Sequence, residues 1–276
     1  MDSLYPVREG FSVAEQSAVV IANTAVNPEY RHLVVTAEPP ATAALAGQFF
    51  HLLCPSSPDG NPFLRRPMSV YAVDAMRGRV EFLYKLMGAG TRGLAMLEPG
   101  DRLNMLGPLG KGFALDPAWK HIIVLGRGVG LATLAPLALM AERASVRVTA
   151  ILSARRPDLV MSVDLFRARG AEVIVVNDAD HSSEVGNVER LLRDLVARGR
   201  ADAFFTCGSN RLLLLLQRLG NEHGIPGQVA LEQQMACALG MCFCCVRDFH
   251  APNGGVEHRR VCWEGPVFGL QEPLSW

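Results

Sequence analysis

Four cysteines near the C-terminal end constrain this chain more than any other feature. Cys237, Cys242 and Cys245 have the spacing C-x4-C-x2-C, and Cys262 follows after sixteen more residues. A plant-type 2Fe-2S cluster takes three thiolates from one tight loop and a fourth from a distant segment. Gly240, within the first gap, leaves the backbone room to wrap such a cluster. The spacing therefore predicts a 2Fe-2S centre with these four cysteines as ligands.

Other interpretations of the cysteines stay open at this point. Structural zinc sites usually show two C-x2-C pairs or a Cys/His set, whereas here one gap of four, one gap of two and a lone fourth cysteine occur. A chain that binds no metal is a further alternative, although its cysteines are too closely spaced for a disulfide framework. Cys244 is an extra thiol beside Cys245 and could replace it as the third ligand, with the spacing C-x4-C-x1-C.

The length and charge of the chain limit its class. With 276 residues it is long enough for two domains and a small appendage. Its 27 basic and 27 acidic residues give a formal net charge of zero, which provides no argument for nucleic acid or a membrane surface as partner. Arg127 interrupts the most apolar stretch, so we expect no membrane span. The first ten residues contain no apolar export signal and seven cysteines suit a reduced compartment, so we expect a cytoplasmic protein.

Residues 1–115 show short β-type runs separated by turn residues, after a loose lead-in of about thirteen residues. Strands are expected at 18–24, 32–36, 47–54, 68–73, 80–87 and 102–106, and a short helix at 91–97. Several short strands with regular turns predict an antiparallel barrel or sandwich.

Two stretches of this first segment suit a phosphate. Arg66 stands at the head of an expected strand and Ser69 lies three residues on, so a guanidinium and a hydroxyl could meet a diphosphate. Gly88 and Gly90 lead into a helix with Thr91 as its expected N-cap, where free N–H groups attract phosphate. A solvated basic loop and an ordinary strand–helix turn are the alternatives. The occurrence of both stretches within about twenty-five residues favours one shared ligand.

Residues 116–228 alternate between strands and helices. Strands are expected at 121–125, 147–153, 172–176 and 202–206, and helices at 130–143, 159–167, 188–197 and 210–223. This alternation predicts a parallel sheet with helices on both faces, which binds ligands at the carboxyl ends of its strands.

Glycine loops follow two of these strands. Gly126-Arg-Gly-Val-Gly130 stands between a strand and a helix, a dinucleotide pattern weakened by the lack of the full G-x-G-x-x-G. Arg155 and Arg156 follow the second strand and could accept a 2′-phosphate, or they could form a solvated turn. Cys207 and Gly208 end the fourth strand, where a nicotinamide could lie, and a small buried cysteine is the alternative.

In this order the segments resemble the electron-transfer subunits of class 1B dihydroorotate dehydrogenase, within the ferredoxin–NADP reductase superfamily. The matching stretches are Arg65-Arg66-Pro67-Met68-Ser69, Tyr84-Lys85 with Gly88-x-Gly90-Thr91, Gly107-Pro108-Leu109-Gly110-x-Gly112-Phe113, Cys207-Gly208, Met235-Ala236-Cys237 and Arg260-Val261-Cys262. The resemblance implies a multi-domain fold of three parts: an FAD-binding β-barrel at 1–115, a Rossmann-like NAD-binding α/β domain at 116–228 and a 2Fe-2S segment at 229–276.

Carried over residue by residue, the resemblance also implies the site residues. FAD contacts would come from Arg66, Pro67, Met68, Ser69, Tyr84, Lys85, Gly90 and Thr91, dinucleotide contacts from Gly126, Gly128 and Gly130, and cluster ligation from Cys237, Cys242, Cys245 and Cys262.

The function implied by the resemblance is a relay of electrons among NAD(H), FAD, a 2Fe-2S cluster and a catalytic partner subunit that holds FMN, in pyrimidine synthesis. Flavin suits this place because it exchanges both hydride and single electrons. A reductase that feeds an oxygenase, demethylase or other acceptor from NAD(P)H is the second hypothesis, and a redox or iron sensor is the third. The chain departs from the family at Arg127, Pro136 and Gly208-Ser209-Asn210, so the choice between NADH and NADPH stays open.

Overall fold

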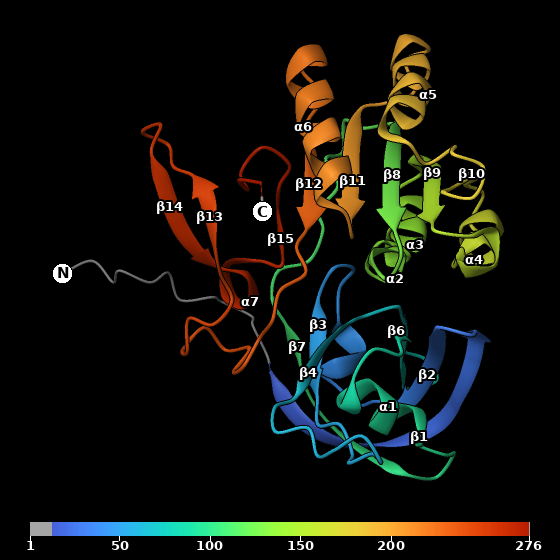
Figure 1. Ribbon diagram of the computed structural model, residues 1–276, viewed down its shortest axis with the longest axis vertical. Helices are drawn as coiled ribbons and strands as arrows, with labels where there is room; N and C mark the ends of the chain where they lie inside the picture. The colour runs from blue at the N-terminus through green and yellow to red at the C-terminus, as the bar shows by residue number, and fades with distance from the viewer. Residues whose placement is uncertain (1–12, 276) are drawn as a thin grey trace.

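The computed structural model describes residues 13–275 and consists of a curled antiparallel sheet, a parallel sheet with helices, and a small two-stranded sheet (Figure 1). Most of the lead-in expected at the N-terminus lies outside the described residues. The two larger sheets lie one above the other in Figure 1, and the C-terminal segment runs beside both.

The curled sheet has seven strands in the order β4-β3-β7-β1-β2-β6-β5. The strands are β1 (Ala14–Asn27), β2 (Tyr30–Thr36), β3 (Phe49–Leu52), β4 (Arg66–Ser69), β5 (Ala72–Asp74), β6 (Arg79–Lys85) and β7 (Arg102–Leu109), with the turn η1 (Ala41–Ala43) and helix α1 (Ala89–Ala95) between them. Phe50 and Phe82 meet edge to face in its interior, with 5.6 Å between ring centroids.

One strand expected at 68–73 is in fact two, β4 and β5, which form the opposite edges of the curled sheet. The chain crosses between the edges at two residues. The amide of Val70 donates to Gln48 beside β3, and the amide of Tyr71 donates to Glu81 on β6. The strand is interrupted because consecutive residues bond to opposite edges, and this crossing brings the two edges together.

The parallel sheet has six strands in the order β10-β9-β8-β11-β12-β15. The strands are β8 (His121–Arg127), β9 (Arg147–Ala154), β10 (Glu172–Asn177), β11 (Ala203–Cys207), β12 (Gly227–Ala230) and β15 (Val267–Gly269). Around them stand α2 (Gly130–Leu134), α3 (Pro136–Arg143), η2 (Pro157–Leu159), α4 (Val163–Ala168), α5 (Val185–Ala197) and α6 (Asn210–His223). The chain order reverses on either side of β8, which is the point where such sheets bind ligands.

Three details of the parallel sheet differ from the sequence predictions. The single helix expected at 130–143 is divided into α2 and α3, because Pro136 lacks the N–H that would continue the first helix. The helix expected at 159–167 begins only at Val163, after the turn η2. Strands β12 and β15 were not predicted, and β15 pairs antiparallel to β12 although it comes from the C-terminal segment.

The C-terminal segment contains a hairpin of β13 (Val246–His250) and β14 (Val256–Arg260), followed by the short helix α7 (Val261–Glu264). A single apolar cluster joins this segment to both larger sheets, since it includes Phe49 of β3, Leu125 of β8 and Val261 of α7. The segment is therefore packed against both sheets by the hydrophobic effect. Within residues 13–275, none of the helices is both long and apolar enough to span a membrane.

Candidate redox-cofactor sites

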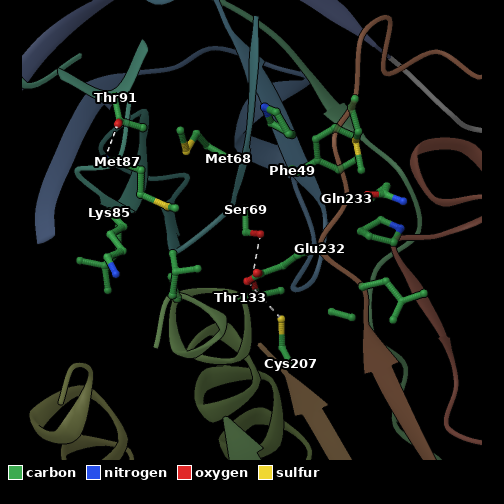
Figure 2. A pocket seen from close by; sticks show the side chains of 18 residues that line it. Phe49, Met68, Ser69, Lys85, Met87, Thr91, Thr133, Cys207, Glu232 and Gln233 are labelled. Atoms are coloured by element: carbon green, nitrogen blue, oxygen red, sulfur yellow. Dashed lines mark hydrogen bonds between the residues drawn. The ribbon is translucent and has the colours of Figure 1, made fainter. Parts of the chain in front are cut away.

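A pocket of about 880 Å³ of empty space lies where the two larger sheets and the C-terminal segment meet, and we call it the central pocket (Figure 2). Its lining comes from all three parts of the chain: Phe49, Pro67, Met68, Ser69, Leu83, Lys85, Met87, Thr91, Val129, Ala132, Thr133, Cys207, Ala230, Leu231, Glu232, Gln233, Met235 and Pro266. Six of the residues predicted from the sequence are thus brought together: Pro67, Met68, Ser69, Lys85, Thr91 and Cys207.

A chain of polar side chains crosses the central pocket (Figure 2). The Thr133 hydroxyl donates to the Ser69 hydroxyl at 2.8 Å, and the Cys207 thiol donates to Glu232 Oε1 at 3.9 Å. Glu232 has exposed surface because it lines the pocket, yet protein surrounds it closely enough for desolvation to raise the pKa of its carboxyl. Burial likewise raises the pKa of the Cys207 thiol. The pocket therefore combines an apolar wall with a short polar path between the two sheets.

Sequence reasoning missed Thr133 and Glu232. Glu232 lies just beyond β12, a strand too short to be expected from the sequence. An acidic residue at the carboxyl end of a parallel strand is a recognisable indication of a ligand site, and it would have been found had that strand been predicted. Thr133 lies within α2, where its position carries no sequence pattern.

Arg66 lies at the edge of this region, against the start of α1. A Cβ on Gly90 would stand 3.0 Å from Arg66 Nε, so glycine allows the guanidinium stem to lie on the helix. Thr91 is the third helical residue rather than the N-cap that we expected, and its hydroxyl accepts from the amides of Met87 at 2.8 Å and Gly88 at 3.1 Å. A guanidinium beside a helix start suits a diphosphate.

Tyr84 does not reach the central pocket. Its side chain is buried inside the curled sheet, and its hydroxyl donates to Asn23 Oδ1 at 3.0 Å. Burial raises the pKa of this phenol to about 12. The placement of Tyr84 therefore supports a role in the core rather than the flavin contact implied by the family resemblance.

A second pocket, of about 700 Å³, adjoins the central pocket and shares Lys85, Met87 and Val129 with it. We call it the glycine-loop pocket, because Gly128 and Gly208 line it at the carboxyl ends of β8 and β11. Its other lining residues are Glu29, Tyr30, Arg127, Ala154, Arg155 and Leu159. This is the edge of the parallel sheet at which a dinucleotide is expected.

The remaining glycines of the loop serve packing. A Cβ on Gly126 would stand 2.7 Å from both Leu131 and Leu134, and one on Gly130 would stand 2.5 Å from the Cys207 carbonyl. Gly126 and Gly130 thus bring α2 close against β8 and β11, which aims the helix start at the pocket.

The basic residues of the glycine-loop pocket all have carboxylate partners. Glu29 accepts from Arg155 through both oxygens at 2.8 Å and from Lys85 at 2.9 Å. Arg156 pairs with Asp158 at 2.9 Å. Because Glu29 and Asp158 already neutralise both arginines after β9, the structure provides no unpaired guanidinium there for a 2′-phosphate.

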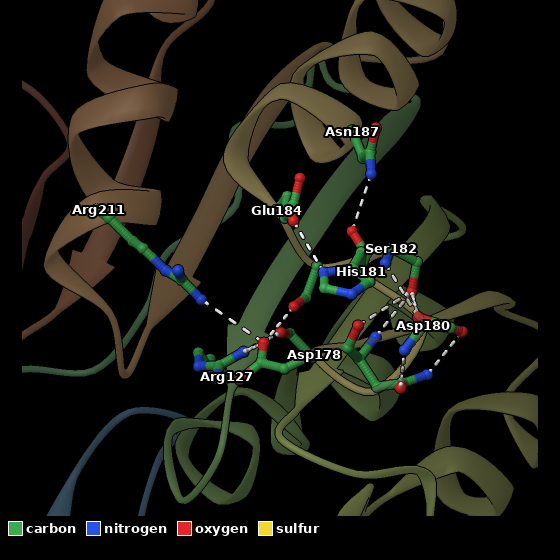
Figure 3. A network of polar contacts seen from close by, with 11 residues as sticks. Arg127, Asp178, Asp180, His181, Ser182, Glu184, Asn187 and Arg211 are labelled. Atoms are coloured by element: carbon green, nitrogen blue, oxygen red, sulfur yellow. Dashed lines mark hydrogen bonds and ion pairs between the residues drawn. The ribbon is translucent and has the colours of Figure 1, made fainter.

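Arg127, within the glycine loop, is held at the end of β8 by a polar network (Figure 3). Its guanidinium donates to both oxygens of Asp178, at 3.1 and 2.6 Å, and to Ser153 at 2.9 Å. Hydrogen bonds from Arg127 and from Ser183 lower the pKa of the Asp178 carboxyl to about 2. Arg127 therefore ties together the ends of three neighbouring strands instead of reaching freely into the pocket.

The four cysteines of the proposed cluster lie as two pairs, in which Cys237 contacts Cys242 and Cys245 contacts Cys262. Among residues 13–275 there is no group of three or more His, Cys, Asp or Glu side chains that could hold a single metal ion. A cluster of two irons with four cysteine ligands takes two thiolates per iron, so two pairs are the arrangement it needs. The donor set therefore fits a 2Fe-2S cluster better than structural zinc.

Hydrogen bonds favour the thiolates of Cys237 and Cys245, whereas the contact with Cys245 raises the pKa of the Cys262 thiol. Burial raises the pKa of the Cys237 thiol, but hydrogen bonds from the amides of Leu239 and Cys242 outweigh it and lower the pKa to about 7. The Cys262 thiol and amide both donate to Cys245, whose pKa falls to about 6. Amide donors to thiolate sulfur are a recognised means of stabilising iron–sulfur ligands.

Cys244 has a different environment from Cys245. Its thiol is exposed and donates to the carbonyl of Gln234 at 3.8 Å, whereas Cys245 is buried beside Cys262. This placement supports Cys245 as the third ligand.

Several known proteins that are similar in sequence agree on one family. A family model, the iron-sulfur cluster binding domain of dihydroorotate dehydrogenase B, matches residues 232–272. The dihydroorotate dehydrogenase B (NAD(+)) electron transfer subunit of Desulforamulus reducens is 32% identical over 252 residues, which are 91% of this chain and 95% of that protein. The subunit of Bacillus caldolyticus is 34% identical over 230 residues, 82% of this chain and 85% of its own. This chain belongs to the family of dihydroorotate dehydrogenase B electron transfer subunits.

Solved structures confirm the fold class of this family member. An NADH-dependent reduced ferredoxin-NADP oxidoreductase matches with a TM-score of 0.78 and 23% identity, over 94% of this chain and 90% of its own. A ferredoxin reductase in carbazole 1,9a-dioxygenase matches with a TM-score of 0.61 and 20% identity, over 78% of this chain and 68% of its own. At these identities the likeness concerns the fold, and it confirms the predicted combination of an antiparallel sheet with a parallel α/β sheet.

Proposed function

We propose that this chain is the electron transfer subunit of a dihydroorotate dehydrogenase B, and that it relays electrons between NAD(H) and a catalytic partner subunit through FAD and a 2Fe-2S cluster. One observation carries the proposal: the paired cysteines lie directly beyond a pocket that adjoins the glycine loop. Met235 lines that pocket two residues before Cys237. The sites for hydride donor, flavin and cluster therefore follow one another in the order that a relay needs.

The residues of the central pocket fit FAD. When bound, FAD exchanges hydride with nicotinamide and single electrons with an iron–sulfur cluster. Arg66 and the start of α1 would bind its diphosphate, and Ser69, fixed by Thr133, would orient its ring. Cys207 and Glu232 line the central pocket and also a further pocket with Gly208 at the carboxyl end of β11, so they would meet the nicotinamide.

The cysteine loop supports the proposal of a partner subunit. Cys242 is exposed, and so are the apolar side chains of Leu239, Met241 and Phe243 around it. Exposed apolar residues gathered at one place mark an interaction surface. We propose that the catalytic subunit docks here and that FMN is its redox centre, so that electrons cross at the cluster.

The three parts of the chain would divide this work. Residues 1–115 would bind FAD, residues 116–228 the pyridine nucleotide, and residues 229–276 the cluster. The unpredicted strand β15 lies in the third part but completes the sheet of the second, which would hold the cluster segment rigidly against the nucleotide domain.

The test is reconstitution with a dihydroorotate-oxidising FMN subunit, after anaerobic titration of the purified chain with NADH and NADPH. We expect NADH to bleach the flavin, to produce the EPR signal of a reduced 2Fe-2S cluster, and to support NAD⁺-dependent orotate formation in the complex. Reduction of flavin and cluster without orotate formation would instead favour a reductase that serves another acceptor. A chain that carries neither flavin nor iron would refute the relay.

A further inference from the structure

The guanidinium of Arg260 contacts both intervals between the three cysteines of the loop, Cys237 to Cys242 and Cys242 to Cys245. Arg260 Nη1 donates to the carbonyl of Gly240 at 2.8 Å, and Gly240 lies in the gap between Cys237 and Cys242. The Arg260 guanidinium also lies over the ring of Phe243, 5.1 Å from its centroid, and Phe243 lies between Cys242 and Cys245. Arg260 itself stands two residues before Cys262. A single side chain thus ties the three-cysteine loop to the segment that carries the fourth cysteine.

The loop needs such support because its backbone is strained. Ala238 and Phe243 both have a φ of +58°, a left-handed conformation that residues with side chains rarely adopt. Strained residues persist only where their surroundings fix them. Gly240, with a φ of +78°, packs so closely on Trp263 that a Cβ would stand 3.0 Å from that side chain. Residues 260–264 therefore fix the conformation of the loop through the contacts of Arg260 and Trp263.

Glu264 neutralises Arg260 at this position. Its carboxylate accepts from Arg260 Nε at 3.1 Å and from the Arg260 backbone amide at 2.7 Å, and it also bonds Nη2. The Arg260 side chain is 14% exposed and that of Glu264 is 28% exposed. The pair therefore forms a largely buried, balanced set of charges beside the cysteines. Removing either charge changes the net charge beside the cysteines, at a position only partly screened by water.

We propose that Arg260 is a positioning residue that holds the cysteine loop in its ligand-binding shape, and that its balance with Glu264 sets the reduction potential of the cluster. The inference rests on the cluster site of the proposed function. Reduction adds one negative charge to the cluster, and nearby net charge is one of the quantities that sets the potential of an iron–sulfur centre. Neutralising Glu264 makes the net charge near the cluster more positive and so favours the reduced form, whereas neutralising Arg260 makes it more negative and favours the oxidised form.

The experiment compares the purified full-length chain with Glu264→Gln, Arg260→Met and Arg260→Lys. Arg259→Met is the matched control, because Arg259 is the neighbouring arginine and contacts Phe249, Glu257 and Glu272 instead. Three quantities are measured: iron and sulfide content, the rate of cluster reconstitution into apoprotein, and the cluster potential from an EPR-monitored redox titration.

We expect Glu264→Gln to retain its iron. At a fixed solution potential, its ratio of reduced to oxidised cluster should be at least tenfold higher than in the wild type. This corresponds to a rise of about 59 mV in the reduction potential of a one-electron couple. Arg260→Met should lower this ratio to a similar extent and reconstitute at least tenfold more slowly. Arg260→Lys should keep the ratio of reduced to oxidised cluster within twofold of the wild-type value, because the charge remains. It should still reconstitute slowly, because lysine lacks the planar guanidinium that makes these contacts. Arg259→Met should match the wild type in all three quantities.

Unchanged potentials in both Glu264→Gln and Arg260→Met would overturn the electrostatic role, and unchanged reconstitution of Arg260→Met would overturn the positioning role. If Arg260→Met fails to fold, Glu264→Gln still decides the first role and Arg260→Lys the second. A wild-type chain that binds no iron would overturn the proposed function as well, and the wild-type iron assay alone identifies that outcome.

Discussion

The hydroxyl of Thr133 donates to the hydroxyl of Ser69 at 2.8 Å, and this hydrogen bond joins helix α2 of the parallel sheet to strand β4 of the curled sheet. The bond lies inside the central pocket, beside the thiol of Cys207. Residues 64 positions apart in the sequence therefore meet where hydride transfer is proposed. The site is built from both sheets at once, so it depends on their being held in a fixed arrangement.

The first prediction concerns Glu232. Glu232→Gln should slow the reduction of bound flavin by NADH at least tenfold, which corresponds to about 1.4 kcal/mol in activation free energy. The departing hydride leaves a positive charge on the nicotinamide, and a carboxylate in the lining of the central pocket stabilises that charge better than an amide does. Anaerobic stopped-flow absorbance of the flavin measures the rate.

The matched control for this experiment is Glu98→Gln, which changes an exposed carboxylate after α1. It should reduce its flavin at the wild-type rate. Equal rates in Glu232→Gln and the wild type would show that the carboxyl takes no part in hydride transfer.

The second prediction concerns the choice between NADH and NADPH. Glu29 forms ion pairs with both Arg155 and Lys85, so Glu29→Gln should release two cations at the glycine-loop pocket. The released cations can then pair with the 2′-phosphate of NADPH. We expect kcat/KM for NADPH to rise about tenfold and that for NADH to change less than twofold, from flavin-reduction kinetics with each nucleotide.

Asp158→Asn provides the comparison, since it releases Arg156 alone. A gain for NADPH in this variant but not in Glu29→Gln would identify Arg156 as the phosphate contact. No gain in either variant would mean that the 2′-phosphate does not reach the arginines after β9.

The parts of the site that could be predicted from sequence are those encoded locally. The spacing of Cys237, Cys242 and Cys245 lies within one loop, and Ser69 and Gly128 lie within short motifs at strand ends. Local patterns of this kind are readable because backbone geometry fixes which neighbours can converge. The parallel sheet was likewise predictable from its alternation of strands and helices.

The parts that could not be predicted depend on tertiary packing. Thr133 acquires its partner only because the fold brings α2 to the end of β4, and no residue near it in sequence indicates this. β15 joins the parallel sheet from the C-terminal segment and is too short to show a strand pattern. Tyr84 belongs to the motif that carries the family resemblance, and the motif alone does not indicate that the alternation along β6 turns its side chain into the core.

The third prediction concerns acid stability and His51. This imidazole on β3 is buried, and its pKa is lowered from 6.5 to about 4. Burial is the largest cause, and the nearby charges of Arg65 and Arg66 add to it. A hydrogen bond to the Met235 backbone acts in the opposite direction and raises the pKa. The unfolded chain therefore binds a proton at this residue before the folded chain does, so stability must fall as pH falls below 6.5. From pH 7 to pH 5 the loss is about 2 kcal/mol.

His51→Gln removes the titration and keeps a side-chain donor for the Met235 carbonyl. Denaturant unfolding at pH 7 and pH 5 should show a smaller acid loss in this variant than in the wild type, by about 2 kcal/mol. His258→Gln, at an exposed position on β14, serves as the control and should show the wild-type loss. Parallel pH dependences in all three proteins would mean that His51 has an ordinary pKa.

The fourth prediction separates the two adjacent cysteines. Cys245→Ser should lose the cluster, because its sulfur is paired with Cys262 and receives the Cys262 amide. Cys244→Ser should keep it, because that thiol is exposed and bonds only weakly to the Gln234 carbonyl. Iron content and the EPR signal of the dithionite-reduced protein measure both outcomes.

Cys54→Ser controls for the loss of a thiol elsewhere, since Cys54 is buried in the curled sheet and burial raises its pKa to about 11. This variant should retain full iron content. If Cys244→Ser lost its iron while Cys245→Ser retained it, the third ligand would be Cys244 and the loop would have to turn by one residue on binding iron. Such a turn would break the contact of Cys245 with Cys262, which the arrangement of cysteines in two pairs requires.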